Sequence, residues 1–171
     1  MAGPDPACDL AHGEQPTPAD GRTLIAVFTS PVARHLLHFA ADAGFRTALV
    51  EPDPDRRAGL ADAHAAINPA LLGPDVDVVV TDHHRPELGE LLRDVLLAGP
   101  TRWVGIMGNP RHPGPHVAAL AALGVPEHAV ARVHRPIGLN IGSRTPAEIA
   151  IATLAGLIAD RNHRPGGFHF G

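Results

Sequence analysis

Arginine and histidine are the residues of this sequence best suited to chemistry, because lysine and tyrosine are absent. All 14 basic residues are arginine, and 12 histidines are spread over the 171 residues. Without lysine, the chain has neither a Schiff-base lysine nor the lysine of a P-loop. Arginine is then the strong cation that remains for binding phosphate. Histidine could transfer protons or bind a metal near neutral pH.

Five histidines follow segments that we interpret as strands, and could form a metal or proton-transfer cluster. They are His83, His84, His112, His116 and His134. Their spacing matches no compact metal motif, and Pro113 and Pro115 interrupt helical geometry between His112 and His116. We therefore predict polar loop histidines rather than a metal site, with Asp82 capping a turn.

Two arginines each follow a turn that contains glycine and that opens a helix. They are Arg111 and Arg144. A guanidinium beside the N–H groups of a helix N-terminus suits phosphate. Residues 138–146 (GLNIGSRTP) form the better defined of these two segments. A structural turn whose arginine pairs with a carboxylate explains the pattern equally well, so both interpretations stay open.

The first strand–helix turn, residues 27–32 (VFTSPV), lacks the glycines of a dinucleotide-binding turn. Such turns have the sequence G-x-G-x-x-G, which lets the backbone approach a pyrophosphate. Phe28 stands where the first glycine would be, and Ser30 followed by Pro31 is typical of an N-cap. We predict that Ser30 caps the helix, with anion binding there as the alternative. Glu51, about 20 residues downstream, could bind ribose hydroxyls or could be a solvated loop carboxylate.

Apolar segments alternate with helix-like segments, and these elements must position the side chains above. Continuous apolar runs indicate buried strands at 24–28, 47–50, 76–80, 103–107 and within 130–137. The remaining pattern predicts helices at 32–43, 54–66, 87–97, 117–123 and 145–160. This alternation predicts an α/β fold, a three-layer Rossmann-like parallel sheet with helices on both faces. In such sheets ligands bind beyond the carboxyl ends of the strands.

The last helix has the clearest start signal in the chain. Thr145 at the N-cap, Pro146 at the first helical position and Glu148 two residues later form a capping-box sequence. The helix is apolar almost all round, which is typical of a helix in the core or in a subunit interface. Burial in the core is the default expectation and a homodimer interface is the more specific one; we expect a homodimer.

Composition bounds the class of protein. With 44% hydrophobic and 19% charged residues, the composition is that of one globular domain. A formal net charge of −4 offers no basic surface for nucleic acid, and no apolar run is long enough to span a membrane. The single Cys8 and the absence of a signal-like segment favour a cytoplasmic protein. We expect a disordered tail at 1–22, one domain at 23–162 and a flexible tail at 163–171.

Four segments are specific enough to compare with a known family. They are residues 78–83 (VVVTDH), 103–111 (WVGIMGNPR), 131–139 (ARVHRPIGL) and 141–150 (IGSRTPAEIA). Together they resemble the C-terminal Rossmann domain of the xanthine dehydrogenase accessory (XdhC/CoxI) family, and the resemblance extends over residues 22–163. At 28–31 the sequence FTSP replaces the family's G-A-G-H or G-A-G-P. The family's separate N-terminal domain has no counterpart, so Cys8 is not equated with that domain's cysteine.

The resemblance implies a molybdenum-cofactor chaperone. Such proteins bind molybdopterin cofactor, protect it during sulfuration and pass it to an apoenzyme of the xanthine dehydrogenase or carbon monoxide dehydrogenase type. We therefore expect a binding module with no catalytic residues. Its partner would be that molybdenum hydroxylase apoenzyme or a separately encoded protein with the XdhC N-terminal domain. The alternatives are an NAD(P)-binding Rossmann oxidoreductase and a non-catalytic scaffold that docks a partner subunit.

The cofactor-binding residues that we expect share one location, the carboxyl ends of the strands and the turns that follow them. They are Ser30, Glu51, Thr81, Asp82, His83, Gly105, Gly108, Asn109, Arg111, Gly142, Ser143 and Arg144.

Overall fold

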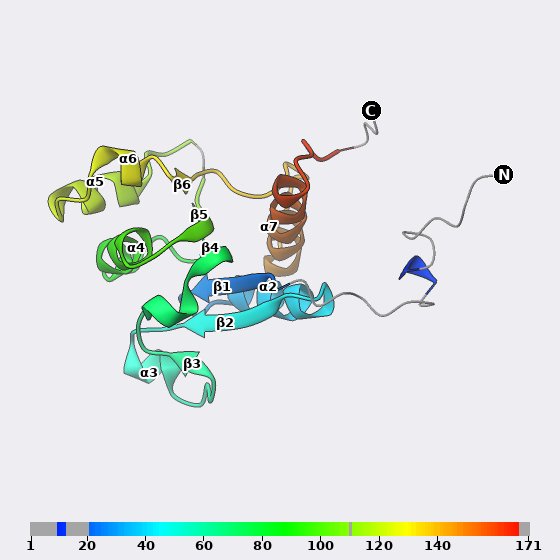
Figure 1. The fold of residues 1–171 in the computed structure, drawn as a ribbon, viewed down its shortest axis with the longest axis horizontal. Helices are drawn as coiled ribbons and strands as arrows, with labels where there is room; N and C mark the ends of the chain where they lie inside the picture. Colours follow the sequence, from blue (N-terminus) through cyan, green and yellow to red (C-terminus); the bar gives the residue numbers. More distant parts are fainter. Residues whose placement is uncertain (1–9, 13–20, 110, 168–171) are drawn as a thin grey trace.

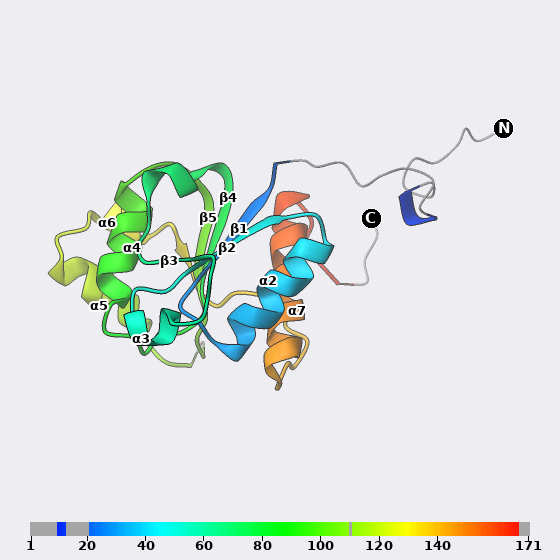
Figure 2. The same cartoon turned by 90° about the horizontal axis from the view of Figure 1, so that it is seen from below.

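The computed structural model describes residues 10–12, 21–109 and 111–167. The two longer ranges form one parallel sheet covered by helices (Figures 1 and 2). The strands are β1 (Thr23–Val27), β2 (Arg46–Val50), β3 (Ala63–His64), β4 (Gly73–Val80), β5 (Thr101–Ile106) and β6 (Val133–His134). The helices are α2 (Pro31–Asp42), α3 (Pro54–Arg57), α4 (Leu88–Leu97), α5 (Pro115–Ala122), α6 (Glu127–Val130) and α7 (Pro146–Arg161), with a short 3-10 helix η1 (Pro69–Leu71).

The order of the strands places a ligand crevice in the middle of the sheet. They are arranged β3-β2-β1-β4-β5-β6, and every neighbouring pair is parallel. The chain runs outward from β1 in one direction to β3 and in the other direction from β4 to β6. The crossovers therefore diverge between β1 and β4, and this leaves a crevice at the carboxyl ends of these strands.

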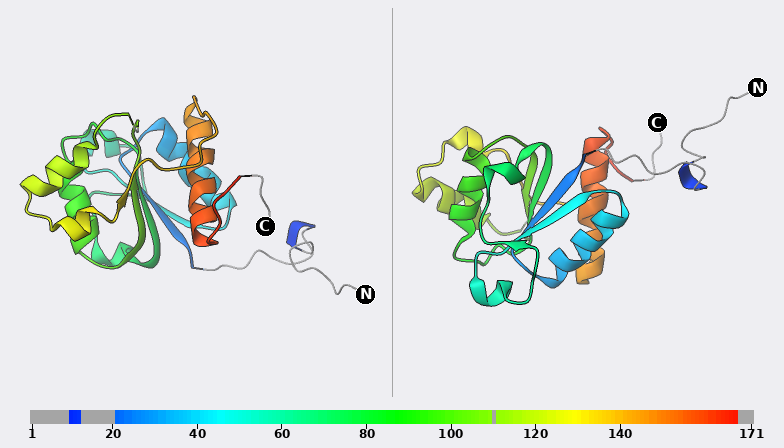
Figure 3. Two further views of the ribbon diagram at one scale, coloured as in Figure 1. Left: turned by 90° about the horizontal axis from the view of Figure 1, so that it is seen from above. Right: turned by 60° about the horizontal axis from the view of Figure 1, so that its bottom comes forward.

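Two layers of helices bury the sheet on both faces. Figure 3 shows α2 and α7 on one face, and α4, α5 and α6 on the other. Successive residues of a strand point to opposite faces, so Leu24 packs with the α2–α7 layer and Ile25 with the α4–α5 layer. Both are fully buried. This burial on two faces explains the continuous apolar runs and confirms the predicted α/β, three-layer Rossmann-like fold.

The segment 54–66 differs from the helix expected there. Helix α3 ends at Arg57, and Ala63–His64 pairs with β2 as the edge strand β3. Asp53 starts the helix by accepting hydrogen bonds from the N–H groups of Asp55 and Arg56. Gly59, at φ +82°, then turns the chain into a left-handed conformation that ends any helix.

Helix α7 begins as its sequence predicts, but it is not buried all round. Thr145 accepts a hydrogen bond from the N–H of Glu148, whose carboxylate accepts one from the N–H of Thr145, so the capping box is confirmed. Leu154 and Leu157 face α2 and the sheet, whereas Ile151 is 50% exposed. The helix is therefore covered on one side, and a homodimer stays a prediction.

The expected tails fall mostly outside the described residues. Residues 1–9, 13–20 and 168–171 are not described, and Cys8 is among them. The structure describes 163–167 as turn and irregular chain after α7. Within the part of the chain that the structure describes, no helix has both the length and the apolar character needed to span a membrane.

Candidate functional site

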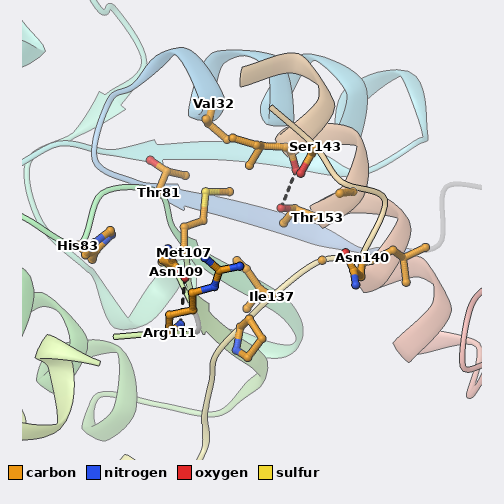
Figure 4. A pocket seen from close by; sticks show the side chains of 16 residues that line it. Val32, Thr81, His83, Met107, Asn109, Arg111, Ile137, Asn140, Ser143 and Thr153 are labelled. Atoms are coloured by element: carbon orange, nitrogen blue, oxygen red, sulfur yellow. Dashed lines mark hydrogen bonds between the residues drawn. The ribbon is translucent and has the colours of Figure 1, made fainter. Parts of the chain in front are cut away.

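A pocket of about 830 Å³ lies at the carboxyl ends of β4, β5 and β6, where the loop before α7 covers it (Figure 4). Six of the predicted site residues line it: Thr81, His83, Gly108, Asn109, Arg111 and Ser143. Apolar side chains such as Met107, Ile137 and Ile149 form much of its wall. None of the described residues that line the pocket is acidic, so nothing in this wall repels an anion.

The loop after β5 presents Arg111 to the pocket, and Arg135 holds that loop in place. The Arg135 guanidinium donates hydrogen bonds of 2.7 Å to the carbonyl oxygens of Asn109 and His112. The Asn109 side chain accepts a hydrogen bond from the N–H of Arg111. A Cβ on Gly108 would lie 2.7 Å from the Arg135 guanidinium, so this glycine makes room for a neighbouring side chain. Sequence reasoning missed Arg135, because its contacts are with residues more than 20 positions away.

The opposite wall of the pocket is a loop packed directly on α7. Gly138, at φ +84°, lies so close to the helix that an added Cβ would be 3.1 Å from the backbone of Ala152 and Thr153. The N–H of Leu139 donates a hydrogen bond to the carbonyl oxygen of Ala152. Gly156 in the helix allows the same approach from its own side. These contacts fix the position of the loop that carries Ser143. In the sequence, the two glycines at 138 and 156 are the residues that indicate this close approach.

The pocket wall carries one permanent charge, that of Arg111, among its described lining residues. Burial, together with the nearby charges of His84 and Arg135, lowers the pKa of His83, so this ring is neutral at pH 7. Asp82 caps a turn, as expected, by accepting a hydrogen bond from the N–H of His84. Arg111 then supplies a cation on the pocket wall and Arg135 supplies one behind it. Such a site suits an anion.

The five histidines of interest do not gather into a cluster. His83 lines the pocket and its ring lies 4.0 Å from that of His84. His116 is buried in α5, where burial and the charge of Arg135 lower its pKa. The ring of His134 stacks on Trp103. Among the described residues, no three side chains of histidine, cysteine, aspartate or glutamate lie close enough together to hold a metal ion.

Four other predicted residues lie outside the pocket wall. Ser30 is the N-cap of α2, as predicted, because its hydroxyl accepts a hydrogen bond from the N–H of Ala33. Gly105 is inside β5, where a Cβ would collide with the ring of Trp103. Gly142 and Arg144 belong to the loop before α7 but are not among the lining residues.

Glu51 is neither solvated nor available to a ligand in this structure. Its side chain is fully buried, and the Arg85 guanidinium donates to both carboxylate oxygens at 2.9 and 3.1 Å. Burial alone would raise the pKa of Glu51, but hydrogen bonds from Arg85, Thr29 and Asp53 outweigh burial and lower it. The interpretation of Glu51 as a solvated loop carboxylate was therefore wrong. Nothing in the sequence around Arg85 indicates this pairing.

The fold and the position of the pocket define the class of the protein. A parallel sheet in the order 3-2-1-4-5-6, with a pocket beyond its carboxyl edge, is a Rossmann-type domain. The family model described as the XdhC Rossmann domain matches residues 24–157. The chain belongs to this family, as the resemblance of its four segments implied.

Two proteins that this chain resembles are longer than the chain itself. Over 103 residues it is 36% identical to the uncharacterized protein YqeB of Escherichia coli K12, a match to 60% of this chain and 18% of YqeB. It is 27% identical to a Bacillus halodurans protein whose crystal structure is described as that of a xanthine dehydrogenase. That match has a TM-score of 0.64 and covers 84% of this chain and 45% of the other. The chain thus spans less than half the length of either relative.

Proposed function

We propose that this chain binds the molybdenum cofactor and acts as an accessory protein in the maturation of a molybdenum hydroxylase. The observation that carries the proposal is the cationic pocket at the carboxyl edge of the sheet, without an acidic lining residue. Membership of the XdhC family supports this role, as does similarity to a protein described as a xanthine dehydrogenase. The apoenzyme would be of the xanthine dehydrogenase or carbon monoxide dehydrogenase type.

The residues of the pocket fit the two chemically different parts of a pterin cofactor. Arg111, Asn109 and Ser143 offer donors for a phosphate group, and bonds between a guanidinium and phosphate are among the stronger hydrogen bonds in proteins. Met107 and Ile137 offer apolar surface for a flat ring system. A volume of about 830 Å³ is in the range of pockets that enclose small ligands.

This chain would bind and shield the cofactor rather than carry out a reaction of its own. The molybdenum centre supplies redox chemistry to the enzyme that receives it. Here Arg111 would hold the phosphate, the loop packed on α7 would limit access of water, and neutral His83 would be a hydrogen-bond partner at the rim. We further propose that the chain works in the cytoplasm as a homodimer, with the exposed Ile151 side of α7 at the interface.

Delivery requires a second protein, which we propose is the apoenzyme or a separate protein with the XdhC N-terminal domain. The loops around the pocket lie at the edge of the sheet, where a partner could reach a bound ligand.

Two arginine variants test the proposal. Arg111→Ala removes a lining guanidinium and should weaken the binding of molybdopterin about tenfold or more, whereas Arg144→Ala, outside the lining, should change it less than about twofold. Binding is measured by separating bound from free molybdopterin under anaerobic conditions, after which the pterin in each fraction is oxidised and quantified by its fluorescence. Absence of saturable binding to the unaltered chain would overturn the proposal. Equal losses in both variants would place the phosphate elsewhere.

A further inference from the structure

Three buried side chains meet where a dinucleotide-binding sheet receives its pyrophosphate. They are Phe28, Glu51 and Arg85, which follow the carboxyl ends of β1, β2 and β4. Phe28 and Glu51 are fully buried, and Arg85 is 7% exposed. The Arg85 guanidinium lies 4.6 Å from the centre of the Phe28 ring while it binds Glu51. The three side chains thus form one packed unit, which we name the β1–β2 plug.

The backbone at Phe28 keeps the shape of a glycine turn although a large side chain is present. Its φ of +70° lies in the left-handed region that glycine adopts easily and phenylalanine rarely does. Two contacts hold this conformation: the N–H of Phe28 donates to the carbonyl oxygen of Val50, and its own carbonyl oxygen accepts from the hydroxyl of Thr81. Phe28 therefore places a buried side chain where a dinucleotide-binding turn has its first glycine.

The Glu51 carboxylate accepts hydrogen bonds of the kind that a bound phosphate would accept. In dinucleotide-binding folds the N–H groups of the first strand–helix turn point at the pyrophosphate. Here the N–H of Thr29, in that turn, donates to Glu51 at 2.9 Å. The N–H of Asp53 donates to the other oxygen at 3.0 Å, and Arg85 balances the negative charge. At the start of α2, the N–H of Ala33 is already bonded to Ser30.

We infer that the Glu51–Arg85 pair substitutes for a nucleotide phosphate at the N–H groups of Thr29 and Asp53, so that the chain excludes dinucleotides. The pocket beside Arg111 then remains for a phosphate, and it suits a ligand with a single phosphate group. The single-phosphate part of this inference rests on the proposed function, whereas the exclusion of a pyrophosphate at Thr29 follows from the β1–β2 plug itself. NAD, which carries a pyrophosphate, would be rejected for this reason.

The first test uses the unaltered full chain and ADP-ribose, a probe that carries a pyrophosphate. Amide signals are followed by two-dimensional NMR of ¹⁵N-labelled protein during the titration. The N–H signals of Thr29 and Asp53 should not shift, because both donors are bonded to Glu51. A saturable shift of these two signals at millimolar or lower ADP-ribose would overturn the inference.

The second test opens the β1–β2 plug. Glu51→Ala combined with Arg85→Ala removes both charges together, so neither is left buried without its partner. This variant should bind ADP-ribose at least tenfold more tightly than the unaltered chain, with a shift of the Thr29 signal. Arg93→Ala with Asp94→Ala removes an exposed ion pair and is the matched control, which should gain nothing. A folded double variant without this gain would overturn the role of the pair. The titration of the unaltered chain decides the question if that variant does not fold.

Binding of molybdopterin, measured in parallel, separates this inference from the proposed function. If the unaltered chain binds neither molybdopterin nor ADP-ribose, the proposed function fails and the exclusion of a pyrophosphate is supported. If it binds both and Thr29 responds to ADP-ribose, the inference fails and the proposed function is supported.

Discussion

Replacing Arg85 with alanine should lower the free energy of unfolding more than the removal of any single exposed charge does. The change leaves Glu51 fully buried without the guanidinium that donates to both of its oxygens. It also removes the cation that lies on the ring of Phe28. The N–H groups of Thr29 and Asp53 remain as donors, but they carry no full charge.

Two routes give the same magnitude for this loss. Breaking a buried ion pair by removing one partner costs about 3–5 kcal/mol. Alternatively, Glu51 takes up a proton, which at pH 7 costs about 3.7 kcal/mol for a carboxyl with an ordinary pKa of about 4.3. The variant follows the cheaper route, so its free energy of unfolding should fall by about 3–4 kcal/mol at pH 7.

The size of the loss should depend on pH in a defined direction. In the unaltered chain the pKa of Glu51 is lowered, so its stabilising effect is present above the unfolded-state pKa and is lost as the pH falls through the folded-state value. In the variant, burial without Arg85 raises the pKa of Glu51, and protonation in acid relieves the penalty. The difference between the two proteins should therefore shrink by about 1.4 kcal/mol per pH unit between pH 7 and about pH 5.

Urea unfolding followed by the fluorescence of Trp103 measures this difference, because that side chain is 9% exposed and should respond to unfolding. The control is Arg93→Ala, which breaks an exposed pair with Asp94 and should cost no more than about 1 kcal/mol. Glu51→Gln added to Arg85→Ala removes the buried charge but keeps an acceptor for just one of the N–H groups of Thr29 and Asp53, so it should recover part of the loss at pH 7. The reasoning is refuted if the Arg85 variant loses no more than the control, or if its loss does not diminish in acid.

Other predictions concern two glycines, the cap of α7 and the charge of the pocket. Gly124→Ala introduces strain at φ +70° and should lower the free energy of unfolding in urea by about 1–2 kcal/mol. Gly138→Ala should lower it more and should also weaken anion binding, because the added methyl group meets the backbone of α7. Equal losses would contradict the packing argument. Thr145→Ala removes the cap of α7 and should lower the free energy of unfolding by about 1 kcal/mol; an unchanged urea midpoint would count against it. Sulfate, whose charge is constant, should bind more tightly as the pH falls through the lowered pKa of His83, and His83→Gln should abolish that dependence.

Local and strongly repeated signals explain which elements could be predicted from the sequence. The strands were identified because burial on both faces demands continuous apolar runs. The start of α7 was identified because Thr145 and Glu148 satisfy each other within one turn. The edge strand β3 was missed, since it is two residues long and exists through its pairing with β2. Such a strand carries no pattern of its own.

The site residues also divide into those with a local signal in the sequence and those that depend on contacts between distant segments. Asn109, Arg111 and Ser143, which line the pocket, could be assigned to one location because the carboxyl ends of parallel strands share one edge of the sheet. Arg135 and the contact between Gly138 and α7 could not, because they join segments that are distant in the chain.

By itself the sequence determined an α/β fold with its chemistry at one edge, because periodicity and turn residues are encoded locally. The tertiary structure decided what each charged side chain does there. Glu51 follows a strand as a ribose-binding carboxylate would, yet Arg85, 34 residues away, neutralises it and buries it. That pairing depends on β1 lying between β2 and β4 and bringing their carboxyl ends near one another. A charge can be recognised in a sequence, but its partner is set by the packing of the chain.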